Sequence, residues 1–236
     1  MRTGGVSSGP FTSLNVSVSV GDTAEAVREN TRRLAEAAGI RPDIATAHQV
    51  HGDRVVSADG REVLAATQPQ ETGADAVLAL DPGVAAGVRV ADCVPILLHD
   101  ETSGTVAAVH SGWRGTRLSI AARGVRALQH AAGAEPRRIL AAIGPSIGRC
   151  CYEVSAELAV MFRQLFGAEA ADDPAKTPKP HLDLRFCVES ALAQAGVPRE
   201  RIEQVAGCTS CDIDAYFSHR RDKGRTGRHL AFIAAK

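Results

Sequence analysis

The sequence is poor in aromatic residues, which make up 4% of it and include a single tryptophan, Trp113. It has no net charge, because 27 lysines and arginines balance 27 aspartates and glutamates, and this argues against a nucleic-acid binder that relies on phosphate contacts. No apolar run approaches the roughly 18 residues of a membrane helix. The N-terminal MRTGGVSSGP lacks the apolar core of a signal peptide. These absences predict a cytoplasmic protein that binds neither nucleic acid nor membranes.

Short β-type runs dominate the pattern of the chain. The 236 residues, of which 44% are hydrophobic, can bury a sizeable core. The runs cluster too closely for a simple βαβ series, so we predict a mixed α/β (α+β) fold in one domain over residues 1–236. Strands are expected at 14–20, 44–50, 54–57, 76–80, 84–90, 94–99, 105–110 and 139–143, with a final strand near the C-terminus.

Helix boundaries are marked by capping residues. Asp22 with Glu25 resembles a capping box before a first helix that Gly39 would end. Ser155 and Asp183 are candidate N-caps of two later helices. We expect helices up to residue 38 and over 116–132, 156–166 and 184–195, with loops at 58–73 and 168–180.

The stretch 106–116, VAAVHSGWRGT, has the form strand, tight loop and helix. Its two glycines allow the backbone to approach a ligand closely, and the first amides of the coming helix favour an anion. The guanidinium of Arg114 could pair with phosphate or carboxylate, or lie solvated on the surface. Trp113 could belong to this site or serve only packing. The stretch is a candidate binding site.

Three candidate metal ligands, His51, Cys93 and His110, each lie at or just beyond the end of a predicted strand. One thiolate and two imidazoles form the ligand set of a catalytic zinc that keeps its fourth position for water. His48 lies three residues before His51, and on a strand it would face the other side. The same residues also allow an inert buried Cys93 thiol, or a Cys93 nucleophile with a histidine base and Asp92 nearby.

The other cysteines include a C-x-x-C pair, Cys208 and Cys211, that looks like half a zinc site. The adjacent Cys150 and Cys151 are not expected to supply the other half, because neighbouring side chains diverge. Cys187 is the sixth cysteine. A basic run near the C-terminus is either a solvated turn or an anion site, and it consists of Arg220, Arg221, Lys223, Arg225 and Arg228.

Several segments, in order along nearly the whole chain, resemble the YfiH family, also called the laccase-domain or polyphenol oxidoreductase family. The matching segments are GGVSSGPFTSLN at 4–15, QVHGDRV at 49–55, GADAVLAL at 73–80, ADCVPILL at 91–98, AVHSGWRGT at 108–116, IGPSIGRCCYEV at 143–154, HLDL at 181–184, CTSCD at 208–212 and FSHRRDKGRTGR at 217–228. The resemblance implies an α/β domain of mixed sheets packed between helices, similar in fold to a toxin deamidase. It also implies a metal site at His51, Cys93 and His110, with zinc as the usual metal.

The activity implied by the resemblance is phosphorolysis of purine nucleosides, namely adenosine, inosine, guanosine and S-methyl-5′-thioadenosine, with adenosine deamination as a side activity. Purine nucleoside and phosphate are then the substrates, and Cys93 and His110 belong to the catalytic centre. Arg114 and the amides near Gly112–Gly115 are our candidates for holding the phosphate. Glu153 is the nearest motif acid for the general acid/base that a zinc deaminase needs.

Three other functions remain open. Cys93 could serve a cysteine hydrolase or amidase, and some bacterial members of the family are linked to peptidoglycan editing. The protein could also be a non-catalytic binder in which zinc holds strands together. The laccase label implies copper, but the eight histidines are scattered and form no H-x-H pair, so a multicopper cluster is not expected.

Overall fold

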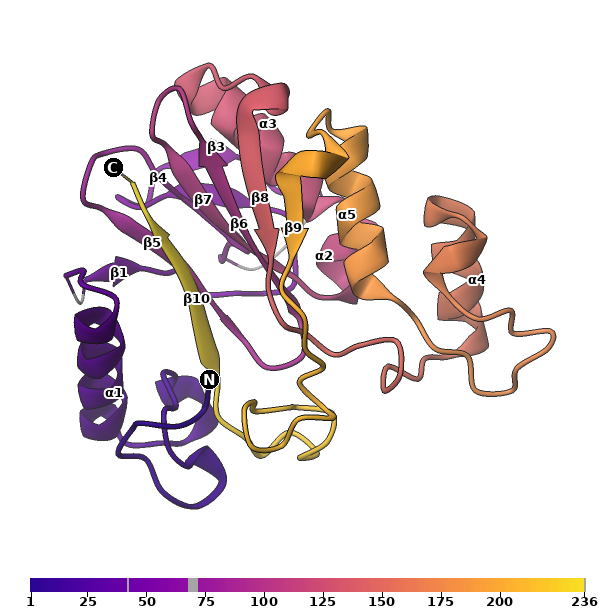
Figure 1. The fold of residues 1–236 in the computed structure, drawn as a ribbon, viewed down its shortest axis with the longest axis horizontal. Helices are drawn as coiled ribbons and strands as arrows, with labels where there is room; N and C mark the ends of the chain where they lie inside the picture. Colours follow the sequence, from indigo (N-terminus) through magenta and orange to yellow (C-terminus); the bar gives the residue numbers. More distant parts are fainter. Residues whose placement is uncertain (42, 68–71, 236) are drawn as a thin grey trace.

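A computed structural model describes residues 1–41, 43–67 and 72–235. Within them, two mixed β-sheets are layered against helices, as Figure 1 shows, so the mixed α/β fold class is confirmed. The larger sheet has seven strands in the order β3-β2-β4-β7-β6-β8-β9, and the smaller has the order β1-β5-β10. The larger sheet consists of β2 (Val55–Ser57), β3 (Glu62–Leu64), β4 (Ala76–Ala79), β6 (Val94–Asp100), β7 (Val106–Ser111), β8 (Ile139–Ile143) and β9 (Ile202–Gln204). The smaller one consists of β1 (Ile44–Ala45), β5 (Ala85–Val90) and β10 (His229–Ala234).

Five α-helices complete the described residues: α1 (Ala24–Ala37), α2 (Trp113–Arg117), α3 (Ile120–Ala132), α4 (Ala156–Phe166) and α5 (Leu184–Gln194). Helices α3 and α5 cover one face of the larger sheet, and the main core lies between the helices and the sheet, with Leu128, Leu192 and Ile96 among its buried residues. The smaller sheet covers the opposite face, where Val88 of β5 and Ala108 of β7 belong to a second buried cluster. The central strands β4 and β7 are buried along their whole length, which explains their continuous apolar sequence.

Most predicted elements are present with nearly the predicted bounds. Ser155 and Asp183 cap α4 and α5, each accepting a hydrogen bond from a backbone N–H three residues on, at 3.3 and 3.0 Å. Gly39, in the left-handed region at φ 66°, follows the end of the first helix as predicted. Two strands inside regions not predicted as strand, β3 and β9, are three residues each and form the two edges of the larger sheet. Such short edge strands have too little periodicity to stand out in a sequence.

The predicted strand at 14–20 is wrong. The segment is irregular and ends in a single 3₁₀ turn, Val18–Val20. The buried Asn15 explains this, because its amide donates to the carbonyl of Ser17 at 2.9 Å and its oxygen accepts from the backbone N–H of Arg228 at 2.9 Å. Local side-chain bonds of this kind compete with a strand ladder. The cap of α1 is also shifted, since Thr23, not Asp22, accepts from the N–H of Ala26.

Two further predictions need correction at the ends of elements. The strand expected over 44–50 is only Ile44–Ala45, and beyond it the side chain of Gln49 exchanges two 2.8 Å hydrogen bonds with the backbone of Arg89 in place of a ladder. The helix expected over 116–132 is divided into α2 and α3. The division occurs at Ser119, which has a left-handed backbone at φ 58°. Helix α2 begins directly after Gly112, earlier than predicted.

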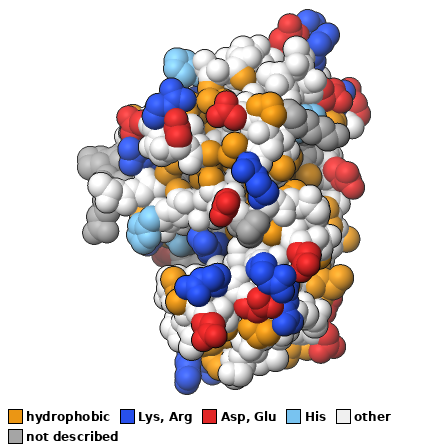
Figure 2. All heavy atoms as spheres, turned by 90° about the vertical axis from the view of Figure 1, so that its left-hand side faces the viewer, with side chains coloured by type: hydrophobic (Ala, Val, Ile, Leu, Met, Phe, Trp, Pro, Cys, Tyr) orange, Lys and Arg blue, Asp and Glu red, His pale blue; other side chains and the backbone are white. Residues whose placement is uncertain are grey.

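Acidic and basic side chains are interspersed over the face seen in Figure 2, with no large area of one sign. This agrees with the zero net charge of the chain. Among the residues that the structure describes, no helix combines the length and apolar character required to cross a bilayer.

Candidate functional site

The predicted ligands His51, Cys93 and His110 converge where strands in the centre of the larger sheet begin and end. Strands β6 and β7 are antiparallel, and the pairing of Pro95 with His110 brings the start of β6 beside the end of β7. The loop before β2 lies at the same end of the strands. Strand β2 runs parallel to β4, and β4 is antiparallel to β7, so β2 begins beside the end of β7. The ligand atoms of the three side chains all lie within 4.8 Å of one another. Sheet topology therefore joins side chains that are 42 and 17 residues apart in sequence.

Asp75, which the sequence reasoning did not single out, organises this site from beneath. It lies just before β4 and is fully buried. One carboxylate oxygen accepts from Nδ1 of His110 at 2.7 Å and from the backbone N–H of His51 at 3.0 Å. The other accepts from the N–H groups of Gly52 at 2.7 Å and Val50 at 3.2 Å. This fixes the His110 ring so that Nε2 is the nitrogen left for a ligand.

Two residues of the site have left-handed backbones. His51 has φ 61° and Asp92, directly before Cys93, has φ 92°. The Asp75 carboxylate holds the His51 turn, while Asp92 accepts from the hydroxyl of Thr209 and the N–H of Arg220, both at 2.6 Å. Such conformations cost roughly 1–3 kcal/mol for residues other than glycine, and they concentrate at functional sites. These backbone conformations direct the side chains of His51 and Cys93 toward each other.

The electrostatics of the trio favour a thiolate. Burial opposes ionisation of Cys93, but the neighbouring imidazoles of His110 and His51 outweigh it and lower the pKa of the thiol to about 6. Burial likewise opposes the charged form of His110, but Cys93 and Asp75 raise its pKa to about 9. Burial raises the pKa of Asp75, yet its bonds to His110 and to the backbone lower it overall. Cys93 is thus prepared to bind a cation or to act as a nucleophile.

The donor set fits a mononuclear metal site. Sγ of Cys93 lies 3.8 Å from Nε2 of His51, and the His51 and His110 rings meet edge-on with centroids 4.9 Å apart. Gly112 closes one side, since a Cβ there would lie 3.0 Å from Sγ of Cys93 and 2.9 Å from Cδ2 of His51. A thiolate and two imidazoles at such spacing can hold a tetrahedral ion with its fourth position open. His48 is exposed and lies outside the group, as the sequence indicated.

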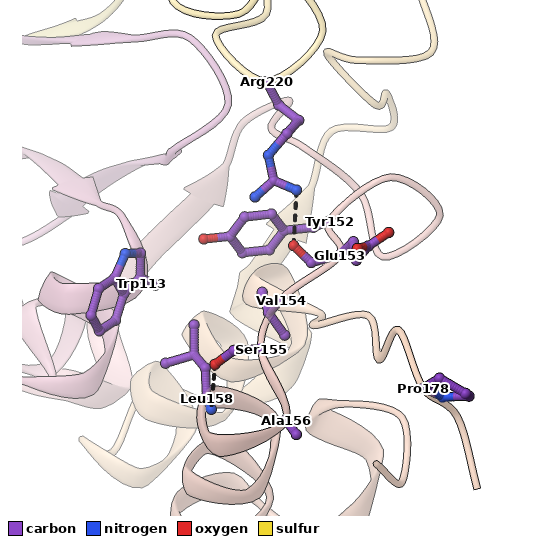
Figure 3. A pocket seen from close by; sticks show the side chains of 9 residues that line it. All are labelled: Trp113, Tyr152, Glu153, Val154, Ser155, Ala156, Leu158, Pro178 and Arg220. Atoms are coloured by element: carbon purple, nitrogen blue, oxygen red, sulfur yellow. Dashed lines mark hydrogen bonds between the residues drawn. The ribbon is translucent and has the colours of Figure 1, made fainter.

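A cavity of about 570 Å³ opens next to this trio, a volume typical of small-molecule sites. Figure 3 shows Trp113 and Tyr152 on its walls with Arg220 above them, and the Arg220 guanidinium lies 5.0 Å from the centre of the Tyr152 ring. Burial and the nearby Cys93 raise the pKa of Tyr152 to about 12, so its phenol stays protonated. Trp113 directly follows Gly112, which lies against Cys93 and His51, and the backbone N–H of Arg220 donates to Asp92, so two lining residues of the cavity are tied to the surroundings of the trio.

The remaining predicted site residues lie differently. Arg114 is exposed, and its guanidinium lies 5.1 Å from the centre of the Trp113 ring, outside the residues that line the cavity. Glu153 does line the cavity, but its carboxylate lies 3.6 Å from Nζ of Lys179 and points away from Trp113 and Tyr152 (Figure 3). Arg220 lines the cavity and anchors to the carbonyl of Glu153 at 2.8 Å. The sequence had marked Arg220 only as one of five basic residues near the C-terminus.

The expectation that the other cysteines cannot form one group is wrong. Cys150, Cys151, Cys208 and Cys211 have their Sγ atoms within 4.8 Å of one another. The reason is that residues 148–152 form a tight turn, in which the N–H groups of Cys151 and Tyr152 both donate to the carbonyl of Gly148. In this turn adjacent side chains need not diverge as they do on a strand.

The whole described site can be compared with known proteins. Residues 1–236 match a family model described as multi-copper polyphenol oxidoreductase laccase. The chain is 38% identical over 242 residues to purine nucleoside phosphorylase YlmD from Geobacillus stearothermophilus, covering 99% of this chain and 87% of that protein. It is 36% identical over 233 residues to adenosine deaminase RL5 from an unidentified prokaryote, covering 96% and 88%.

Solved structures give the same result for the fold. The crystal structure of a hypothetical protein YfiH from Bacillus licheniformis superposes with a TM-score of 0.88 at 32% identity, covering all of this chain and 90% of that one. The family model, the curated relatives named as enzymes and the solved structure all match along nearly the whole chain. The chain therefore belongs to the YfiH, or laccase-domain, family.

Proposed function

We propose that this protein is a zinc-dependent purine nucleoside phosphorylase, with a metal centre at His51, Cys93 and His110. The observation that carries the proposal is a Cys-His₂ donor set close to a cavity whose lining includes Trp113, Tyr152 and Arg220. The name of the Geobacillus relative, purine nucleoside phosphorylase, supports the same reaction. The substrates are a purine nucleoside, such as adenosine, inosine, guanosine or S-methyl-5′-thioadenosine, and inorganic phosphate.

In the proposed reaction a phosphate oxygen forms a bond to C1′ as the bond from C1′ to N9 breaks. The electron pair of the broken bond leaves with the purine, which takes up a proton, and ribose 1-phosphate is the second product. Trp113 and Tyr152 offer flat apolar surfaces to the base. Arg220, with its guanidinium at the cavity wall, and Arg114 are the two cations we assign to phosphate. Holding phosphate against C1′ is the step these residues would accelerate.

The trio fits zinc by its chemistry, because a soft thiolate joins two imidazoles and Asp75 orients one of them. When bound, a zinc ion supplies positive charge and an open coordination position beside the cavity. Cys93 contributes the negative thiolate, and His110 is held by Asp75 so that Nε2 is the ring nitrogen left for a ligand. Copper is less suited as a redox centre here. Among the described residues, the other group of potential metal ligands consists of cysteines alone, whereas a multicopper oxidase needs several copper sites with histidine ligands.

Adenosine deamination is a proposed side activity of the same centre, supported by the relative named adenosine deaminase. The reaction would replace the C6 amine with a water-derived oxygen, and it needs a general acid/base near C6. The Glu153 carboxylate points away from Trp113 and Tyr152, which disfavours it for that role.

A second candidate function is a cysteine hydrolase or amidase, possible substrates being peptidoglycan precursors. The specific observation in its favour is the arrangement of Cys93, His110 and Asp75. The Cys93 thiol lies beside the His110 imidazole, which the buried Asp75 carboxylate orients. In that reaction Sγ of Cys93 would attack an amide carbonyl, and His110 would pass a proton to the leaving amine.

Adenosine incubated with metal-replete protein, with and without phosphate, tests these functions. Adenine and ribose 1-phosphate formed only with phosphate, and lost in His110→Ala, are expected. Inosine formed without phosphate would instead identify deamination as the main reaction. Chelation separates the second candidate, because it should stop a zinc enzyme and spare a thiol hydrolase. No turnover of any purine nucleoside would refute the proposal.

The two arginines give a sharper test of phosphate binding. Arg220→Gln should raise the KM for phosphate by about tenfold or more, since one charge-assisted hydrogen bond is worth about 1.5–3 kcal/mol. Arg114→Gln should raise it less, because Arg114 is exposed and lies outside the residues that line the cavity. Arg117→Gln, also exposed and on the same short helix, is the matched control. An unchanged phosphate KM in both Arg220→Gln and Arg114→Gln would overturn the assignment.

A further inference from the structure

Four cysteines outside the proposed catalytic centre form a compact group. Cys150 and Cys151 come from the turn after β8, and Cys208 and Cys211 from the turn after β9. Sγ of Cys211 lies 3.3 Å from that of Cys151 and 3.6 Å from that of Cys150. All four are free thiols, so no disulfide accounts for the grouping. Two separate segments thus present four soft donors to one point.

The spacing matches a single tetrahedral ion. Four metal–sulfur bonds of about 2.3 Å place the sulfur atoms about 3.8 Å apart. The measured separations of 3.3 and 3.6 Å, and the 4.8 Å limit on all pairs, agree with this value. An iron–sulfur cluster distributes its thiolates over several iron atoms and needs a wider arrangement.

The backbone around the group favours a thiolate at Cys208. The N–H of Gly148 donates to Sγ of Cys208 at 3.2 Å, which stabilises negative charge on that sulfur. Gly148 also leaves room for the group, because a Cβ there would lie 3.2 Å from Sγ of Cys150 and 3.5 Å from Sγ of Cys208. The Arg221 guanidinium, which pairs with Asp222, donates to the carbonyl of Thr209 at 2.8 Å and so holds the turn that carries Cys208 and Cys211.

We propose that Cys150, Cys151, Cys208 and Cys211 bind one zinc ion in a second metal site, separate from the His51, Cys93 and His110 trio. With four protein ligands the site has no open position, so its role is structural. Binding exchanges the thiol protons for the metal and leaves the oxidation states unchanged.

The position of this second site suggests what it stabilises. Cys151 is followed by Tyr152, which lines the cavity. Cys208 is followed by Thr209, whose hydroxyl donates to Asp92 at 2.6 Å, and Asp92 directly precedes Cys93. An ion at the four cysteines would therefore join the two segments that support the cavity wall and the backbone of the first site.

The test uses the full-length chain with the trio removed, as His51→Ala/Cys93→Ala/His110→Ala, purified after growth with zinc. Elemental analysis should find one zinc per chain, and X-ray absorption should find four sulfur ligands at about 2.3 Å. Adding Cys208→Ser and Cys211→Ser should remove that zinc. Adding Ser210→Ala, in the same turn, should leave it bound.

Several results would overturn the proposal. These are a trio variant that folds and holds no metal, a metal bound by nitrogen or oxygen, and zinc retained after Cys208→Ser and Cys211→Ser. Thiol titration showing disulfides among the four cysteines in metal-free native protein freshly purified under reducing conditions would overturn it too. If the trio variant does not fold, the native chain is compared with Cys208→Ser/Cys211→Ser. The loss of one zinc is then expected, and Cys187→Ala, which removes a thiol from the core, should lose none.

Discussion

Replacing Asp75 with asparagine should weaken both the fold and the first metal site. Each carboxylate oxygen accepts two N–H donors, so whichever oxygen the amide nitrogen replaces, two donors lose their acceptor. A hydrogen bond to a charged group contributes about 1.5–3 kcal/mol, and an unsatisfied buried donor costs about 1–3 kcal/mol. We therefore expect the free energy of unfolding to fall by about 3–5 kcal/mol.

The same substitution should lower metal affinity about 10- to 100-fold, or about 1.4–2.7 kcal/mol, because the His110 ring loses the carboxylate that orients it. Urea unfolding of metal-free protein measures the first effect, and competition with a chromophoric chelator measures the second. To separate the two metal sites, the competition is done in a Cys208→Ser/Cys211→Ser background. Asp81→Asn, at an exposed turn between β4 and β5, is the control and should change neither quantity appreciably. Unchanged stability and affinity in Asp75→Asn would refute the assigned role of this carboxylate.

Two further predictions concern the fold. Burial and the nearby N-terminal amine lower the pKa of His229 to about 3, and its neutral Nε2 accepts from the N–H of Phe217 at 2.8 Å. The free energy of unfolding should therefore decline as pH falls below about 6.5, the pKa of histidine in the unfolded chain, and by pH 4 the loss should be about 3 kcal/mol. His229→Gln should flatten this part of a curve of Tm against pH, while the control His130→Gln, at an exposed residue, should not. An unaltered acid limb in His229→Gln would contradict this reasoning. Phe162→Ala should cost about 3–5 kcal/mol in urea unfolding, because this side chain is fully buried, and the half-exposed Leu165→Ala on the same helix should cost much less. Equal losses for the two α4 variants would show that Phe162 does not pack as described.

The two metal-type groups differ in how far the sequence could reveal them. His51, Cys93 and His110 are visible as polar residues at the ends of strands, and resemblance to the YfiH family combined them. Asp75 has no such signal, because a lone aspartate before an apolar strand is equally typical of a turn. Only the sheet register shows that its carboxylate lies beneath His110 and the 50–52 turn.

For the four cysteines, the sequence argument excluded a grouping that the structure contains. The sequence argument treated Cys150 and Cys151 as neighbours on an extended chain, whose side chains point to opposite sides. The turn that closes on the Gly148 carbonyl removes that assumption. Local conformation, not residue spacing, decided whether four thiols could meet.

By itself, the sequence determined the fold class, the central strands and the helices α4 and α5 with their caps, because these depend on local periodicity and on capping within a few residues. It also indicated His51, Cys93 and His110 as candidate metal ligands. Tertiary structure alone decided that 14–20 is not a strand, that the 116–132 helix is divided, and that Asp75, Arg220 and the four cysteines take their places. Most of these features depend on hydrogen bonds and contacts between segments tens of residues apart, which a local pattern does not contain. The division of the helix at Ser119 and the turn at Gly148 depend instead on backbone conformations that the residue pattern did not indicate.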